Sequence, residues 1–551
     1  MDHCSIAGLY FQCFQMDSSA VKFFGFSEFI SGLALLILAW TITDIRYKFR
    51  IATAAIPIEK ISFIIILIVG ILALLTDFWR AQKGWLPLGT IITAESWQLL
   101  LGVLFLLTIL IWLWSAFIRP AYFGPLNSKK FINIINLAIV RGSRRELGII
   151  ANELTRSVSS VVRNTSDRKI DRLTDADKLV TVIGSRKFCE AVVQDAPDLI
   201  FHLFSEISKQ KKYKIDSIEI FTKNIITAAL KNKNSFLYHE TDYYDSALEG
   251  FQKPISSTIY KDIEIIKNIP TLLSPDYEKK SPWNIQEWKA YTRFFLETYI
   301  CYIKSKEQCR PESIHWALII IIPNIIHDLS KNLNINQLST QDDLYIHLQI
   351  LIDLIENMVD NINQEAIHQD STAYQNYCDD IVNLIFLLIK KSSEVQKPRH
   401  IARRIQHEII WMKLLNSHVF REEIGITIIN TIYHKLLVTI SNCPNLDSVK
   451  LFGYCLNVLG FTPPNEGETY GASWRDFHIK FLEWVQSNAS DLLTKYPRMK
   501  SECFVEGMSY DAVKYRIILE YPAIREGDSP IFDYLQLAKP RMRMYAELIL
   551  R

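Results

Sequence analysis

The sequence predicts an all-α protein in which three N-terminal transmembrane helices precede a large multi-helical cytoplasmic region. Three observations lead to this prediction. Apolar stretches crowd the first 118 residues, apolar side chains recur at helical spacing afterwards, and no series of short alternating strands with turn signals follows. The chain of 551 residues is 49% hydrophobic and carries 61 basic against 59 acidic side chains. This composition excludes intrinsic disorder, because it combines ample apolar surface with almost no net charge.

The membrane-spanning prediction comes from uncharged stretches at residues 29–43, 61–76 and 96–118. A spanning helix needs about 20 apolar residues, a length that only the third stretch reaches. We expect the other two helices to extend past their flanking charges, the second of them through Phe78 and Trp79. Such extension costs little because charges at helix ends reach the headgroup region.

Basic residues set the predicted orientation. Ten flank one side of the spans and three the other; the ten are Arg46, Lys48, Arg50, Lys60, Arg119, Lys129, Lys130, Arg141, Arg144 and Arg145. By the positive-inside rule, the N-terminus faces out and the long C-terminal region faces the cytoplasm of a bacterial cell. The six from Arg119 to Arg145 are predicted to contact lipid headgroups of the inner membrane. We expect the lipid bilayer as a partner, and no nucleic acid.

The predicted spans carry no ionisable residue near their centres. Ion-coupled transport usually needs such groups, so a monomeric carrier is not expected. Hydroxyls at Ser31, Thr41, Ser62 and Thr108 could line a pore in an oligomer. We favour the alternative that they bond to the helix backbone or join helices to one another.

Helical periodicity organises the remainder of the chain. Trp288, Tyr291, Phe295, Tyr299 and Tyr302 fall on one helical face, and a second series runs through residues 344, 348, 351, 355 and 358. We predict an extracytoplasmic segment at 1–26, a transmembrane domain at 27–118 and a basic neck at 119–172. Helical units are predicted at 173–280, with an irregular segment from 234, at 281–462 and at 463–551.

Helix starts are predicted from capping residues. Thr174 with Asp177, and Thr340 with Asp343, resemble capping boxes. Ser281 before Pro282 is expected to start the helix that carries the first aromatic face. The apolar runs 316–322 and 381–389 are expected to form central helices covered by their neighbours.

The sequence contains two candidate sites and no established catalytic or cofactor-binding motif. There is no phosphate-binding Gly-rich loop, H-E-x-x-H zinc motif or G-x-S-x-G motif, and no cysteine pair has C-x-x-C spacing. We therefore expect no cofactor and no defined metal site, and we favour a non-enzymatic role. The first candidate combines an imidazole with carboxylates, at His239, Glu240, Asp242 and Asp245, which could bind a divalent metal or serve acid–base catalysis. A solvated, tyrosine-rich loop would explain the same residues without any function.

The second candidate is a basic helical face. His400, Arg403, Arg404 and His407 lie three or four residues apart and could bind an anion. An ordinary solvated helix face is the alternative.

Three functions follow from these predictions. The first is an inner-membrane protein whose helical cytoplasmic region acts as a sensor, scaffold or docking module for a protein partner or for further copies of the chain. The second is an oligomeric, membrane-perturbing effector of the stress or phage-defence type. The third is a membrane-tethered, metal-dependent hydrolase or nuclease that uses the first candidate site.

Overall fold

The fold is mostly helical, as the sequence predicts. The computed structural model describes residues 2–6, 9–15, 22–42, 44–82, 85–87, 94–166, 173–239, 259, 262–277, 282–327, 342–365, 371–464, 472–521 and 529–539. The chain divides into two compact units, Met1–His239 and Glu240–Arg551. The finer domain boundaries proposed from the sequence stay predictions.

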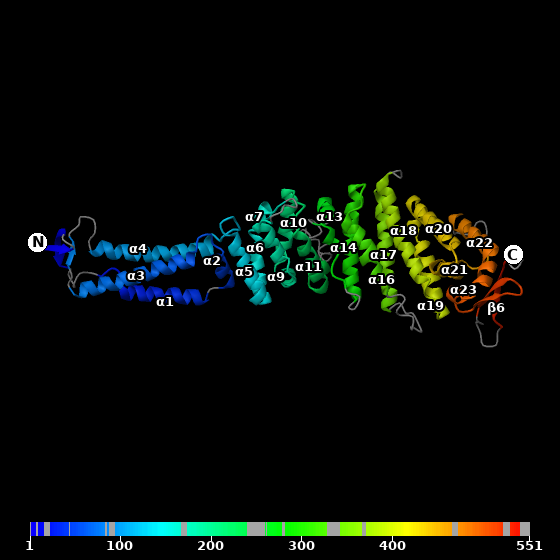
Figure 1. The fold of residues 1–551 in the computed structure, drawn as a ribbon, viewed down its shortest axis with the longest axis horizontal. Helices are drawn as coiled ribbons and strands as arrows, with labels where there is room; N and C mark the ends of the chain where they lie inside the picture. The colour runs from blue at the N-terminus through cyan, green and yellow to red at the C-terminus, as the bar shows by residue number, and fades with distance from the viewer. Residues whose placement is uncertain are drawn as a thin grey trace, which may run out of the picture. The chain divides into compact units, whose positions relative to one another are not determined.

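The first unit begins with an apolar helical bundle. It is built by α1 (Phe26–Ile42), α3 (Ile58–Ala81) and α4 (Ala94–Leu113), and α4 continues as the π-helix η1 (Trp114–Ile118). These three helices lie side by side (Figure 1). The extension of the second stretch past Asp77 is confirmed, because α3 contains both Phe78 and Trp79. A short helix that the sequence did not reveal, α2 (Ile45–Ala52), connects α1 with α3.

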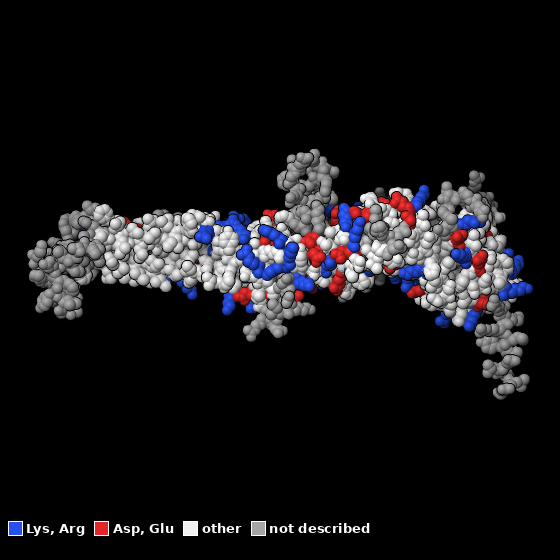
Figure 2. Space-filling model, turned by 90° about the horizontal axis from the view of Figure 1, so that it is seen from above, with Lys and Arg blue, Asp and Glu red and all other residues white. Residues whose placement is uncertain are grey.

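Aromatic rings and glycines hold the bundle together. Phe29, Leu36, Val69, Leu101 and Phe105 form part of its buried core. On the outside, long aliphatic side chains of α3 and α4 are exposed, and Figure 2 shows the bundle as an almost uncharged surface. An apolar exterior of this extent is typical of helices that face lipid.

Close packing explains the glycine in two of the three bundle helices. A Cβ atom at Gly70 would lie 2.7 Å from the Phe29 ring, and one at Gly32 would lie 2.6 Å from the Phe105 ring. At Gly102 the nearest atom, on Phe24, would be 3.4 Å away, an ordinary contact. Gly32 and Gly70 therefore provide the space into which rings of neighbouring helices fit.

Three described helices are long and apolar enough to cross a membrane: Ile58–Ala81, Ser96–Ile118 and Glu423–Ser441. Glu423–Ser441 was not among the stretches predicted to cross the membrane. The predicted stretch at residues 29–43 falls in α1 instead, a helix of 17 residues that packs in the same bundle as α3 and α4. Helix α20 (Glu423–Ser441) packs within the second unit instead. Its exposed face mixes polar Thr427, Thr431 and His434 with apolar Ile426 and Val438.

Shorter helices follow the bundle in the first unit and pack on their neighbours: α6 on α9, α9 on α11, α7 on α10 and α5 on α8. Their bounds are α5 (Ser128–Arg141), α6 (Arg144–Thr155), α7 (Val158–Asn164), α8 (Asp175–Ile183), α9 (Arg186–Asp195), α10 (Asp198–Gln210), α11 (Ile218–Lys231) and α12 (Phe236–His239). The predicted capping box of Thr174 and Asp177 is confirmed at the start of α8.

The second unit is a stack of longer helices. Helix α14 packs on α17, α17 on α18, and α18 on α20 and α21. Helical bounds in this unit are α13 (Ile263–Asn268), η2 (Pro270–Leu273), α14 (Ile285–Ser305), α15 (Glu312–Trp316), η3 (Ala317–Ile321), α16 (Pro323–His327), α17 (Asp343–Gln364), α18 (Thr372–Ser392), α19 (Arg399–Arg403), η4 (Arg404–Leu415), η5 (His418–Arg421), α21 (Leu446–Leu459), α22 (Ala472–Lys495) and α23 (Met499–Cys503).

Both predicted series of apolar positions at helical spacing are buried as expected. The predicted start of α14 was wrong. Asn284 caps this helix and accepts hydrogen bonds from the backbone of Gln286 and Glu287, both at 3.0 Å. The run 316–322 was also expected to be covered on all sides, yet Trp316, Ile319 and Ile320 are exposed.

Two small antiparallel sheets modify the all-α prediction. The first contains β1 (Asp2–Ile6), β2 (Leu9–Gln15) and β3 (Trp85–Pro87), in the order β1-β2-β3. The second contains β4 (Met508–Asp511), β5 (Arg516–Tyr521) and β6 (Ile531–Gln536), in the order β4-β5-β6. The unit predicted as helical from residue 463 therefore ends in strands. The alternating buried positions Ile517 and Leu519 of β5 were the available signal.

Candidate functional site

A buried ion pair joins the bundle to the helices that follow it. The guanidinium of Arg50 on α2 donates two hydrogen bonds to the carboxylate of Glu153 on α6, from Nε at 2.7 Å and from Nη2 at 2.9 Å. The two side chains are only 7% and 5% exposed. Arg46, one turn earlier, approaches the same carboxylate at 3.3 Å but is 45% exposed. Two-point arginine–carboxylate contact fixes direction as well as distance, so α6 is held against α2 in one orientation.

The same arginine reaches the end of the last bundle helix. Arg50 Nη1 donates to the carbonyl oxygen of Ala116 in η1 at 3.0 Å. Carbonyl groups in the last turn of a helix lack partners within the helix, and the negative end of the helix dipole favours a cation there. Tyr47 lies under the guanidinium, 5.3 Å from ring centroid to Cζ, and its ring is 4.2 Å from that of Phe117. Arg50 thus contacts α2, η1 and α6 at one point, which we call the exit joint.

A second set of contacts secures the C-terminal end of α2. The amide of Asn127 donates to the carbonyl oxygen of Thr53 at 2.9 Å. The ammonium of Lys130 on α5 donates to the carbonyl oxygens of Ala54 and Ala55 at 2.7 and 3.1 Å. These contacts supply partners to carbonyl groups that follow the helix.

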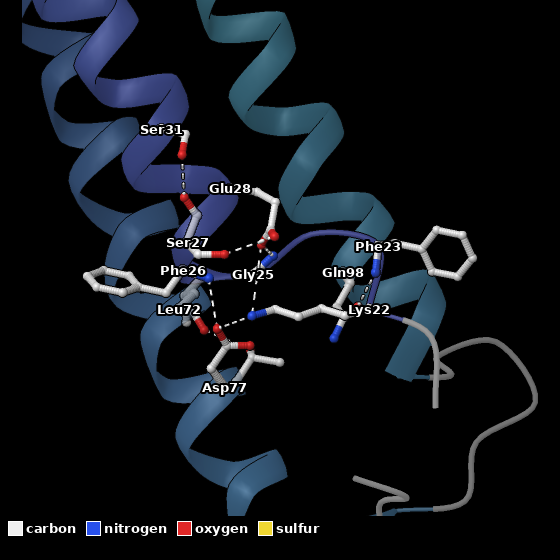
Figure 3. Close-up of polar contacts among 11 residues, drawn as sticks. Lys22, Phe23, Gly25, Phe26, Ser27, Glu28, Ser31, Leu72, Asp77 and Gln98 are labelled. Carbon is white, nitrogen blue, oxygen red and sulfur yellow. Dashed lines mark hydrogen bonds and ion pairs between the residues drawn. The ribbon is translucent and has the colours of Figure 1, made fainter. Parts of the chain in front are cut away.

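The opposite end of the bundle carries a second polar cluster (Figure 3). The ammonium of Lys22 lies 2.8 Å from the carboxylate of Asp77 on α3 and 3.9 Å from that of Glu28 on α1. The backbone N–H of Phe26 donates to Asp77 at 2.8 Å, and that of Phe23 donates to the side-chain oxygen of Gln98 on α4 at 3.1 Å. Charges therefore gather at the two ends of the bundle.

Two of the four hydroxyl groups singled out in the sequence bond to their own helices. Ser31 Oγ donates to the carbonyl of Ser27 at 2.9 Å, and Thr108 Oγ1 donates to that of Leu104 at 2.7 Å. This matches the interpretation favoured from the sequence for those two residues. Thr41 has a side chain outside the described set.

The residues predicted to contact lipid headgroups differ in their surroundings. Arg119, Lys129, Arg141, Arg144 and Arg145 are exposed. The sixth, Lys130, is half-buried and bonded to the chain after α2, as given above. Arg144 donates from Nη2 to the carbonyl oxygen of Glu190 at 3.0 Å. Their role at a lipid surface stays a prediction.

The first candidate site falls largely outside the described residues. His239 is exposed at the end of α12, and its Nε2 lies 3.1 Å from the carbonyl oxygen of Lys233. Glu240, Asp242 and Asp245 lie outside the described residues. Among the residues that are described, no three His, Cys, Asp or Glu side chains gather as a metal site.

The second candidate site spans a change of helix type. His400 and Arg403 are exposed on α19, whereas Arg404 and His407 are half-buried in the π-helix η4. Burial and the positive charge of Arg403 lower the pKa of His407. A neutral imidazole at neutral pH adds no positive charge, which weakens the case for an anion site.

Arg399, which precedes this face, makes contacts that the sequence did not predict. Its guanidinium donates to the carbonyl oxygen of Glu520 on β5 and lies over the ring of Tyr521, 5.2 Å from its centroid. Its backbone N–H donates to Glu506 at 3.1 Å. Arg399 therefore fixes the C-terminal sheet to α19.

A buried polar cluster in the second unit also escaped the sequence analysis. Asp380 on α18 pairs with Arg310 at 2.8 Å and accepts a hydrogen bond from Tyr299 on α14 at 3.3 Å. Burial raises the pKa of Asp380 to about 7, and the Arg310 charge and the Tyr299 hydrogen bond oppose this shift. Tyr302 and Tyr377 pack beside it, with ring centroids 4.8 Å apart. Such pairs are rarely visible in a sequence because their partners are distant along the chain.

Comparison with protein-family models, with curated proteins and with solved structures finds no match to this chain.

Proposed function

We propose that this protein is a membrane-anchored sensor or scaffold. In this proposal the bundle lies in the bilayer, and the helical remainder docks a protein partner or a second copy at the membrane surface. The exit joint is the observation that supports it best. A flexible tether would suffice to anchor a soluble domain, whereas Arg50 contacts the third apolar helix and α6 at once. A buried, two-point ion pair resists bending, so a movement of the bundle would reach the attached helices.

The proposal places the bundle in the bacterial inner membrane with the helical remainder in the cytoplasm. It rests on the excess of basic residues at the end of the bundle that carries the exit joint. A reporter that is active only in the cytoplasm, fused after Arg551, should give signal. A reporter that is active only outside the cytoplasm, fused at the same position, serves as the control, and signal from it alone would contradict the orientation.

Docking is tested by cross-linking cells that express the tagged full chain and purifying the chain in detergent. We expect a defined cross-linked species, either a partner protein or a multimer of this chain. The Glu153→Gln variant should lose or alter that species, while Arg46→Gln should retain it. Purification of the uncross-linked monomer alone, in the wild type and both variants, would refute the docking role.

The effector function is separated by a dye that reports membrane potential. Under the scaffold proposal, expression of the full chain leaves the potential unchanged while the cross-linked species forms. Depolarisation that depends on expression of the intact chain would instead identify an effector.

A further inference from the structure

We propose that a cavity on the water-exposed part of the first unit binds an organic phosphate, meaning a phosphate monoester that is either dissolved or carried by a lipid headgroup. The cavity has a volume of about 270 Å³ and is lined by residues of α6, α9 and α11. These helices pack together, with α9 contacting both of the others. Figure 2 shows basic side chains gathered in the part of this unit that follows the bundle.

The charges lining the cavity are unbalanced. Arg144 and Arg186 are the first residues of α6 and α9, and Lys231 is the last residue of α11. Against these three cations the lining contains one carboxylate, Glu190, which lies 3.7 Å from Arg186. The lining therefore keeps an excess of two positive charges, which matches the charge of a phosphate monoester near neutral pH.

The arginines are arranged to receive such a group. Arg144 Nη2 donates to the carbonyl oxygen of Glu190, which holds this guanidinium against α9 near Arg186. A guanidinium is planar and presents several N–H donors, so it can still bind a phosphate oxygen while one donor is used. The cationic side chains alone attract the phosphate, so the site does not depend on the dipole of any helix.

Neutral polar groups complete the lining and point to an organic ligand. Gln194 and Asn224 contribute side-chain amides, and Thr227 lies buried beside Ala228. The amide of Asn224 is held in place because its Nδ2 donates to the carbonyl oxygen of Gly184 at 2.7 Å. Amides both donate and accept hydrogen bonds, so they suit hydroxyl groups next to a phosphate.

Glycerol 3-phosphate is the probe for a dissolved ligand, titrated by calorimetry into the full chain in phosphatidylcholine nanodiscs. Retention of phosphatidic acid by the detergent-purified chain, measured by native mass spectrometry, probes the lipid source. The test variant is Arg186→Gln/Lys231→Gln. The control is Arg163→Gln/Lys233→Gln, which removes the same charge from exposed residues that lie outside the lining and outside the predicted headgroup contacts. Thermal unfolding verifies that both variants are folded.

We expect the wild type and the control to bind one of the two probes saturably, and the test variant to bind it at least about tenfold more weakly. Calorimetric binding identifies a dissolved phosphate, and selective loss of phosphatidic acid identifies a lipid headgroup. Equal binding by the two folded variants, or no saturable binding of either probe by the wild type, overturns the proposal.

Discussion

Neutralising Glu153 should destabilise the exit joint more than neutralising any exposed charged residue near it. Glu153→Gln preserves the size of the side chain but leaves the buried Arg50 guanidinium with one uncharged acceptor and the carbonyl of Ala116. Removing one partner of a buried ion pair costs about 3–5 kcal/mol, because the other charge stays desolvated. With side chains only 7% and 5% exposed, this pair belongs to that class.

Hydrogen exchange of the full chain in nanodiscs measures this effect locally. A loss of about 3 kcal/mol in the opening free energy should accelerate exchange of α2 and α6 amides roughly a hundredfold. Arg46→Gln removes a 45% exposed partner of the same carboxylate and should cost about 1 kcal/mol or less. The double variant Arg50→Met/Glu153→Met should recover most of the protection, because well-packed apolar replacements of a buried pair are often neutral or stabilising.

The ranking of these variants is decisive. If Glu153→Gln accelerates exchange no more than Arg46→Gln does, the Arg50–Glu153 pair does not stabilise the packing of α2 on α6. If the double methionine variant exchanges its α2 and α6 amides faster than Glu153→Gln and Arg46→Gln do, the joint depends on charge in a way that desolvation does not explain.

Three further changes test packing and titration. Gly70→Ala should destabilise the detergent-solubilised chain by about 1–3 kcal/mol, because the new Cβ meets an aromatic ring. Gly102→Ala, with ordinary contact only, should be neutral or stabilising by up to about 1 kcal/mol; equal thermal shifts would contradict this. Asp380 has a folded-state pKa raised to about 7, against about 3.9 when unfolded. Stability should therefore fall as pH rises through this interval, and Asp380→Asn, unlike Asp379→Asn, should flatten that dependence in thermal unfolding. Gly453→Ala places a Cβ 1.8 Å from a backbone oxygen and should cost about 3 kcal/mol or more, and an unchanged melting temperature would show that α23 yields easily.

Local patterns predicted much of the helical fold. The aromatic series from Trp288 to Tyr302 is buried along α14, and Thr174 with Asp177 caps α8 as expected. These features depend on residues within a few positions of one another. The start of α14 was misplaced because Asn284 offers as good a cap as Ser281 and stands nearer the periodic residues. The C-terminal sheet was missed because its strands are short and only β5 alternates clearly in burial.

The exit joint could not be predicted in the same way. Arg50 and Glu153 are 103 positions apart, and in the sequence Arg50 is one of several basic residues near a predicted span. The positive-inside count treats such residues as equivalent. In the structure, however, Arg50 is buried and its neighbour Lys48 is exposed. Asp380 and Arg310 present the same difficulty, because their pairing depends on how α18 packs near α14.

The charges near the two ends of the bundle limit the apolar length that each helix would offer to a bilayer. Between Lys60 and Asp77, α3 offers 16 uncharged residues, or about 24 Å of apolar length, whereas the 23 uncharged residues of α4 and η1 offer about 34 Å. In a bilayer with a hydrocarbon core about 30 Å thick, the uncharged part of α4 and η1 would exceed the core, and α3 would span it only with Asp77 and the residues after it near the headgroups. A thicker bilayer would strain α3 and a thinner one would tilt α4. Because Arg50 holds the carbonyl of Ala116 at the end of α4, membrane thickness would act mechanically on the exit joint.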